Sequence, residues 1–204
     1  LPDLDAFLIE STYGDRLHDD ISTTQTKLAD VLRRTVERGG KVIIPAFALE
    51  RTQELLWCLS RIWAEGLAPK VPVYVDSPLA INVTEIFRLH QDYLDEEFQA
   101  ALAEGHDPFN LDGLHYTRTV AESRAINESQ KPCIVISASG MCEVGRILHH
   151  LKHNIEDERN TILVVGFMAR DTLGRRIIDG QKLVRIFGEE YKLRAEVVVM
   201  NLSL

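Results

Sequence analysis

Short apolar runs alternate with stretches whose apolar residues recur at helical spacing through most of the chain. The runs at 6–9, 41–46, 71–76, 133–137 and 161–167 predict β-strands. Helical spacing predicts helices at 22–38, 50–64, 79–93, 95–104, 119–129 and 143–153. Gly39 and Gly40 supply the end of the first helix. This alternation predicts an α/β fold, a Rossmann-like, mainly parallel sheet flanked by helices.

The last part of the chain has a different pattern. After Gly180, residues 182–187 and 193–200 read as two strands joined by 188–190, which predicts a hairpin in a structural layer separate from the α/β body. The sequence begins just before one predicted strand and stops directly after another. We therefore expect an excised or incomplete segment of a longer protein.

Composition narrows the class of protein. The chain has 204 residues and is 45% hydrophobic, which is enough for a real core. It has no apolar run long enough for a membrane span and no basic-then-apolar leader, so a cytoplasmic protein without membrane contact is expected. Its three cysteines, an odd number and widely spaced, predict buried free thiols. A net charge of −8 confines any nucleic-acid contact to a local groove.

Four polar clusters follow predicted strands or begin predicted helices, at 10–14, 76–80, 137–142 and 172–176. Ligands of open α/β sheets gather at the carboxyl ends of strands, which favours a functional interpretation. The alternative is structural: Ser and Thr cap turns and helices, and Pro78 suits a first helical position. Composition alone leaves both interpretations open.

The third cluster suits a phosphate better than the second. Ser139, Gly140 and Met141 are small or unbranched, and Arg146 is expected to project from the first turn of the helix that follows. In the fourth cluster, adjacent arginines at a helix start could clamp a phosphodiester or be solvated. His149 and His153 share a helix face, but no further ligand set accompanies them, so packed or solvated histidines are expected there.

Taken together, these motifs resemble the β-CASP branch of the metallo-β-lactamase-fold RNA nucleases, whose members include ribonuclease J and the endonuclease subunit of the cleavage and polyadenylation specificity factor. The matching stretches are 7–16, 39–48 with Arg51, Gln53 and Glu54, then 76–80, 139–141 and 172–175. The resemblance implies that residues 1–16 end a metallo-β-lactamase-type domain, 17–180 form the β-CASP domain, and 181–204 return into the first domain.

The resemblance also implies hydrolysis of RNA by two zinc ions held in the metallo-β-lactamase-type domain. The family's His-x-His-x-Asp-His motif and its later Ser-Ala-His element are not in this sequence. Of the family's site residues, the acidic one remains as Glu10, where it would orient or exchange protons with a histidine. We therefore expect no metal ligands in this chain and no activity from the chain alone, with its own metallo-β-lactamase-type domain as a missing partner.

The resemblance places single-stranded RNA along the β-CASP surface. The residues expected to contact it are Tyr13, Ser77, Ser139, Gly140, Met141, Arg146, Thr172 and Arg175. Asp171 stands where the family usually has a glycine, and a carboxylate there is unfavourable beside a phosphate. Alternative functions are a non-catalytic RNA-binding or protein-interaction module and a nucleotide-binding α/β domain. Self-association into a homodimer is a further expectation.

Overall fold

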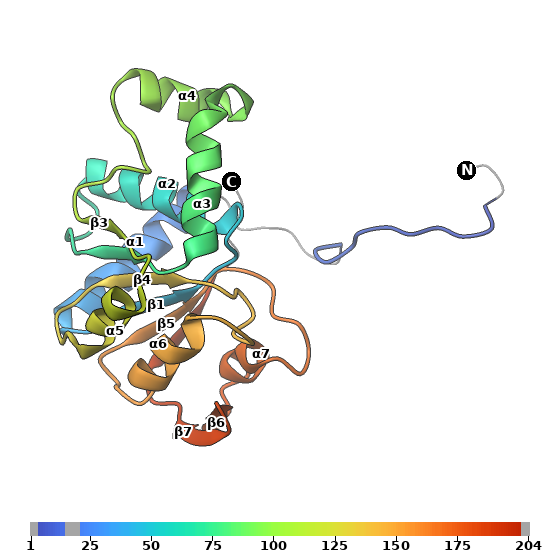
Figure 1. The fold of residues 1–204 in the computed structure, drawn as a ribbon, viewed down its shortest axis with the longest axis vertical. Helices are drawn as coiled ribbons and strands as arrows, with labels where there is room; N and C mark the ends of the chain where they lie inside the picture. Colours follow the sequence, from blue (N-terminus) through green and yellow to red (C-terminus); the bar gives the residue numbers. More distant parts are fainter. Residues whose placement is uncertain (1–3, 15–20, 201–204) are drawn as a thin grey trace.

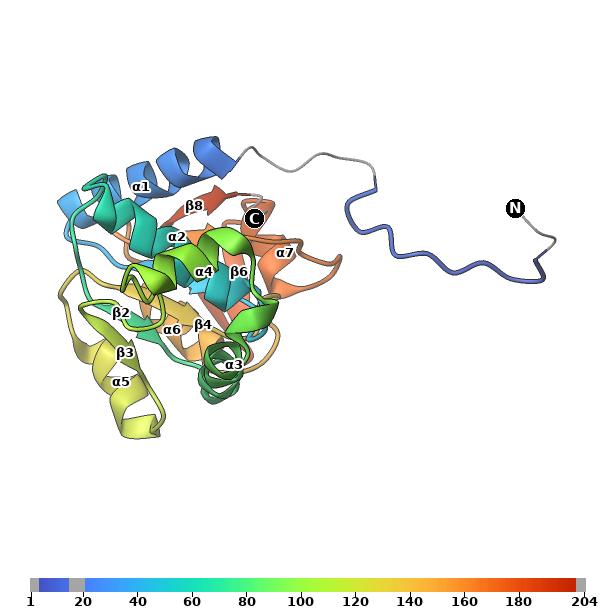
Figure 2. The ribbon, with the colours of Figure 1, turned by 90° about the horizontal axis from the view of Figure 1, so that it is seen from above.

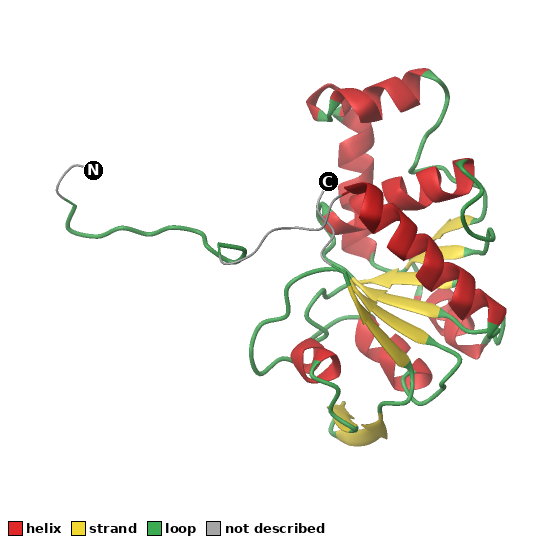
Figure 3. Cartoon of the chain, turned by 180° about the vertical axis from the view of Figure 1, so that it is seen from behind, coloured by secondary structure: helices red, strands yellow, loops and turns green. Residues whose placement is uncertain are grey.

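The fold, seen in a computed structural model that describes residues 4–14 and 21–200, centres on one parallel sheet (Figures 1 and 3). Its strand order is β3-β2-β4-β1-β5-β8, and every neighbouring pair is parallel. The six strands are β1 (Val42–Pro45), β2 (Val73–Val75), β3 (Leu114–Tyr116), β4 (Ile134–Ser137), β5 (Thr161–Val164) and β8 (Glu196–Val199). The predicted α/β fold with a mainly parallel sheet is confirmed.

Helices cover both faces of this sheet (Figures 2 and 3). Those packed with one face are α1 (Ile21–Glu37), α2 (Arg51–Ala64), α3 (Pro78–Leu89) and α4 (Glu96–Ala103), with the 3₁₀ turn η1 (Gln91–Tyr93) between the last two. Those packed with the other face are α5 (Val120–Glu128), α6 (Ile147–Asn154) and α7 (Leu173–Ile178). None of the helices in the described residues is long and apolar enough to cross a membrane.

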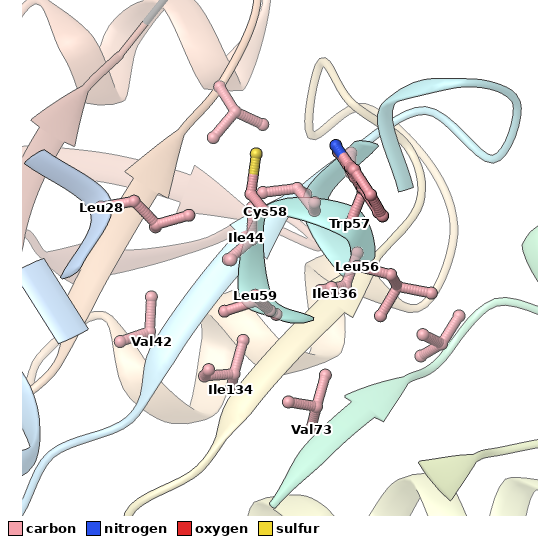
Figure 4. Close-up of a cluster of buried hydrophobic side chains, with 14 of the residues drawn as sticks. Leu28, Val42, Ile44, Leu56, Trp57, Cys58, Leu59, Val73, Ile134 and Ile136 are labelled. Atoms are coloured by element: carbon pink, nitrogen blue, oxygen red, sulfur yellow. The ribbon is translucent and has the colours of Figure 1, made fainter. Parts of the chain in front are cut away.

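Strand side chains alternate between two hydrophobic cores because successive residues of a strand point to opposite faces. Val42 and Ile44 of β1 enter the core under α1 and α2, whereas Ile43 enters the core under α6. All three are at most 1% exposed. Figure 4 shows the first core, where Leu28 of α1 and Leu59 of α2 pack on this row of strands. Full burial of each such side chain contributes roughly 1.5–3 kcal/mol.

The turn after α1 depends on two glycines. Gly39 has a φ of 72°, in the left-handed region that favours glycine. A Cβ on Gly40 would lie 1.8 Å from the carbonyl oxygen of Arg159. Only a residue without a side chain therefore fits beside the loop that leads into β5. The predicted end of the first helix at these glycines is confirmed.

Two predicted strand assignments are wrong. Residues 6–9 form no strand: Phe7, Leu8 and Ile9 are 64%, 91% and 70% exposed, and this segment extends away from the body (Figure 1). A strand needs a neighbour for its backbone hydrogen bonds, and no other described residue pairs with this segment. In addition, residues 193–200 do not form a hairpin with 182–187, because β8 pairs in parallel with β5 and completes the main sheet.

The predicted hairpin exists with a different second strand. β6 (Leu183–Ile186) pairs in antiparallel register with β7 (Glu189–Lys192) as a separate two-stranded sheet. Thus the region after Gly180 contributes one hairpin outside the main sheet and one strand inside it, which corrects the expectation of a wholly separate layer. The division of the chain into domains stays a prediction.

One helix start and one strand also differ from the sequence pattern. α6 begins at Ile147 with Arg146 as its N-cap, not at residue 143. Gly145 explains the delay, because its φ of 88° lies outside the helical region. β3, the three-residue edge strand, is not predicted by the sequence pattern, since it is too short to show a period.

Candidate functional site

The carboxyl ends of all six parallel strands lie at the same edge of the sheet. Three of the four predicted polar clusters follow β2, β4 and β5 there: residues 76–80, 137–142 and 172–176. The first cluster, 10–14, reaches the same edge through Tyr13, whose hydroxyl oxygen accepts a hydrogen bond from the backbone N–H of Phe167 at 3.1 Å. The structure therefore brings all four clusters to one edge.

Residues 10–13 and the strand ends line a pocket, which we call the strand-end pocket. It has a volume of about 390 Å³. The residues that line it come from 10–13, from the ends of β1 and β5, and from the loop after β4: Glu10, Thr12, Tyr13, Pro45, Ala46, Phe47, Arg51, Gly140, Met141, Val165, Gly166 and Phe167. Four predicted site residues, Glu10, Tyr13, Gly140 and Met141, thus share this pocket.

Glu10 is exposed and lies at the wall of the strand-end pocket. Its Oε1 accepts a hydrogen bond from the backbone N–H of Thr12 at 2.8 Å. Hydrogen bonding to Thr12 lowers the pKa of Glu10 below its ordinary value. Glu10 is therefore a carboxylate at neutral pH, available as a hydrogen-bond acceptor.

The loop after β4 approaches the pocket closely because it contains small residues. A Cβ on Gly140 would lie 3.0 Å from the ring of Phe47, so a side chain there would displace that ring. Ser139 Oγ accepts hydrogen bonds from the backbone N–H groups of Glu143 and Val144 at 3.2 and 3.4 Å. The carbonyl of Met141 accepts from the N–H of Gly174 at 3.2 Å, which joins this loop to α7. The loop is held mainly through its backbone.

A buried charged network, which we call the Asp76 network, lies behind this loop. Asp76 is fully buried, and its carboxylate accepts hydrogen bonds from Arg146 Nη1 at 2.6 Å, His150 Nε2 at 2.6 Å and Ser123 Oγ at 2.5 Å. Burial alone would raise the pKa of Asp76, but the hydrogen bonds from His150, Ser123 and Arg146 outweigh it and hold the pKa below its ordinary value.

Arg146 also binds the end of β3. Its Nη1 donates to the carbonyl of Thr117 at 3.1 Å, and its Nη2 donates to the carbonyl of Arg118 at 2.8 Å. Its side chain is 21% exposed. The guanidinium therefore links the loops that follow β2, β3 and β4. The prediction that Arg146 projects freely from the first turn of its helix is wrong.

The hydroxyls of two predicted site residues cap helices. Ser77 Oγ accepts from the N–H of Ala80 at 3.2 Å and begins α3, next to Pro78. Thr172 Oγ1 accepts from the N–H of Arg175 at 3.1 Å and begins α7. The structural interpretation of these hydroxyls is confirmed, and their contact with RNA stays a prediction.

Arg175 and its neighbour Asp171 lie on the surface beside α7. The Arg175 side chain is 45% exposed and pairs with Asp179 at 2.8 Å, an exposed pair that is easily exchanged for another anion. Asp171 is exposed with a φ of 66°, and its carbonyl accepts from Arg176 Nη2 at 3.0 Å. Arg175 is therefore the accessible cation of the fourth cluster.

The three histidines of α6 do not share one environment. His150 is fully buried in the Asp76 network, whereas the ring of His149 lies 4.7 Å from the ring of Phe187. Within residues 4–14 and 21–200, no group of three or more His, Cys, Asp or Glu side chains could hold a metal ion.

The inner members of the Asp76 network were not predicted from the sequence. Ser123 and Asn127 lie four residues apart in α5, and Asn127 Oδ1 lies 3.0 Å from His150 Nδ1. Their i, i+4 spacing beside the buried Ile126 is a signal for a polar strip on an otherwise buried helix face, but the partner of that strip cannot be read from spacing.

The comparisons with known proteins agree on one family. A family model described as the Beta-Casp domain matches residues 52–177, more than half of the chain. Ribonuclease TTHA0252 of Thermus thermophilus is 42% identical over 97% of this chain and 46% of its own length. Transcription termination factor FttA of Methanocaldococcus jannaschii is 34% identical over 100% of this chain and 32% of its own length, and an RNase J-like protein of the same organism is 32% identical. The chain thus spans from about a third to just under half of the length of these relatives.

Proposed function

The chain belongs to the β-CASP family of metallo-β-lactamase-fold RNA nucleases, and from this we propose that it forms the RNA-facing part of an RNA-processing hydrolase. The proposed substrate is single-stranded RNA, and the proposed reaction is cleavage of its phosphodiesters, inside the strand or from an end. Relatives that are named as ribonucleases support the substrate class.

The strand-end pocket is the observation that carries this proposal. It gathers a carboxylate, a phenol and a close-packed glycine loop at the edge where α/β sheets bind ligands. We propose that Tyr13, Ser139, Gly140 and Met141 contact the RNA backbone through hydroxyl and main-chain groups, which position a nucleic acid without reading its sequence.

The remaining predicted contacts take different roles in this proposal. Ser77 and Thr172 would act through the backbone of the helix starts that they cap. Arg175 would exchange its exposed carboxylate partner for a phosphate. Arg146 would act chiefly by holding the loop after β4, since three of its contacts are internal. Arg146→Ala with unchanged RNA affinity would contradict that role.

The described residues do not fit the two zinc ions that the resemblance implies. They contain no group of three or more metal-ligating side chains. We propose that the zinc ligands belong to a longer protein and that Glu10 supplies its carboxylate to orient a histidine of that site. This assignment makes the chain a substrate-positioning part of the enzyme.

The proposal is tested on the purified 204-residue chain. Binding of a fluorescein-labelled oligouridine is followed by anisotropy, cleavage by gel electrophoresis with and without added zinc, and bound metal by elemental analysis. Saturable RNA binding without cleavage and without stoichiometric zinc is expected. Zinc binding with cleavage by the chain alone would contradict the assignment of the zinc ligands to a longer protein. The absence of RNA binding at moderate salt would contradict the proposed function.

A second candidate function is a non-catalytic RNA-binding or protein-interaction module. It is favoured by the same lack of a metal cluster in the described residues and by relatives that are named as transcription termination factors. The discriminating measurement is cleavage by a longer protein that contains this chain. Cleavage there supports the hydrolase, whereas RNA binding without cleavage in both proteins supports the module.

A further inference from the structure

A second groove lies between α5 and α6, on the sheet face opposite α1 and α2. We call it the α5–α6 groove. Its volume is about 810 Å³, larger than that of the strand-end pocket, and Phe187 at the tip of the β6–β7 hairpin borders it. In Figure 1, α5, α6 and this hairpin all lie in the lower half of the view.

Phe187 occupies an unfavourable backbone position. It forms the turn between β6 and β7 together with Gly188, and the φ angles of the two residues are 52° and 81°. Two successive positive φ angles in a hairpin turn favour Asn or Gly, whereas a bulky side chain at the first position is an outlier. Burial does not offset this strain, because Phe187 is 53% exposed. The strained turn thus presents a half-exposed aromatic ring at the tip of the hairpin.

The exposed ring of Phe187 lies beside a second aromatic ring and near several cations. Its centroid is 4.7 Å from that of His149. Arg124 is exposed and makes no hydrogen bond or ion pair with any residue in the described part of the chain. Lys152 pairs with Glu189 at 2.9 Å, with side chains 34% and 64% exposed, an arrangement that a phosphate can replace.

Opposing charges are few at the groove surface. Among the residues that line it, Glu128 is the one carboxylate. The remaining lining cation, Arg146, is neutralised internally by Asp76. Arg124 is thus the cation available to an incoming anion, and Lys152 becomes available when the anion replaces Glu189. These cations lie in a chain whose net charge is −8. Cations that follow a groove together with an exposed aromatic ring are the combination that binds single-stranded nucleic acid.

The loop after β4 reaches both the groove and the strand-end pocket. Arg146 lines the groove and ends the same loop that contributes Gly140 and Met141 to the strand-end pocket. We propose that the α5–α6 groove is a second binding site for single-stranded RNA, in which Phe187 stacks on a base and Arg124 binds a phosphate. This inference rests on the proposed function and adds a track for the strand beyond the strand-end pocket.

Two substitutions test the groove in the intact chain, with anisotropy of a fluorescein-labelled oligouridine as the readout. Phe187→Asn should weaken binding at least about fivefold, the lower limit for loss of one base–aromatic stack. It should leave the thermal midpoint unchanged or raised, because Asn adopts positive φ more readily than Phe. A loss of affinity without a loss of stability separates a binding role from a structural one.

Arg124→Glu should weaken binding and reduce the slope of log affinity against log salt by about 0.7, the value for one phosphate contact on a single strand. The matched control is Arg33→Glu, which makes the same charge change on α1 at the opposite sheet face, where Arg33 pairs with Asp30 on the surface. The control should leave the slope unchanged.

The outcomes separate this inference from the proposed function. If the unaltered chain binds the RNA, but Phe187→Asn binds equally well and both charge variants behave alike, the groove is not an RNA site and the proposed function stands. If the unaltered chain does not bind the RNA, both are overturned.

Discussion

Replacement of Asp76 by Asn tests whether the loops at the sheet edge are held by the Asp76 network. The substitution conserves the size of the side chain. It removes the negative charge and one of the two oxygens that accept from Arg146 and His150. An amide offers one acceptor oxygen, whereas its NH₂ group would face one of these donors. The change therefore leaves Arg146 without its counter-charge and one of the two donors without an acceptor.

The expected loss follows from the burial of each partner. Removal of one partner from a buried ion pair costs about 3–5 kcal/mol. The lower value applies here, because Asp76 is fully buried but the Arg146 side chain is 21% exposed. A loss of about 3 kcal/mol corresponds to a fall of about 6–12 °C in the thermal midpoint for a domain of this size.

Urea unfolding followed by circular dichroism measures this loss. Asp179→Asn is the matched control, since Asp179 pairs with Arg175 on the surface and its replacement should cost less than about 1 kcal/mol. In the double variant with Arg146→Met, the loss should be smaller than the sum of the single losses, because the two groups share one interaction. A loss below about 1 kcal/mol for Asp76→Asn, with an unchanged slope against urea, would refute the reasoning.

The same network gives the protein an acid-sensitive component. The folded pKa of Asp76 is lowered, so its stabilising contribution is present above the unfolded pKa of about 3.9 and is lost as the pH falls towards the folded pKa. Asp76→Asn should therefore flatten the dependence of unfolding free energy on pH below about pH 4. An acid dependence equal to that of the unaltered chain would contradict this assignment.

Three further predictions concern other parts of the molecule. Gly40→Ala should destabilise the chain by at least about 2 kcal/mol in urea unfolding, because its Cβ would lie 1.8 Å from the carbonyl oxygen of Arg159; a loss near zero would show that this turn adapts. The three cysteines are buried, and burial raises the pKa of their thiols to about 12, 11 and 12, so a thiol reagent at pH about 8 should label them only after unfolding. Ser77→Ala should cost about 1 kcal/mol through loss of the α3 cap, whereas Ser77→Gly should cost only a few tenths, and equal losses would contradict the capping role.

Local pattern was sufficient to predict the sheet core and most helices. β1, β4 and β5 are short runs of apolar, mostly β-branched residues that are buried on both faces of the sheet. Because a central parallel strand shows no alternation of polar and apolar residues, its composition and length are enough to identify it. The end of α1 was predictable because glycine has few competing explanations at a helix terminus. These features depend on residues that are close together in the chain.

Features that depend on distant partners were not predictable in the same way. The run at 6–9 has the composition of a strand, but a strand also requires a neighbour, which this segment lacks among the described residues. β8 pairs with β5 and not with β6, although β6 is nearer in the sequence. Arg146 is 70 residues from Asp76 in the chain, so the spacing around it gave no sign that its charge is satisfied internally. Motif positions were thus predictable, whereas the use of each side chain was not.

Arg146 and Arg124 differ in whether their charge is already satisfied within the chain, and this difference predicts different effects of their substitution on RNA binding. Arg146 lies next to the small-residue loop, but its guanidinium already binds Asp76 and two carbonyls, and withdrawing it would leave a buried carboxylate without its cation. Arg124 has no partner in the described part of the chain and loses nothing internal when it binds a phosphate. Substitution of Arg146 should therefore lower RNA affinity together with stability, whereas substitution of Arg124 should lower affinity alone, and measuring both quantities for both variants distinguishes a positioning residue from a contact.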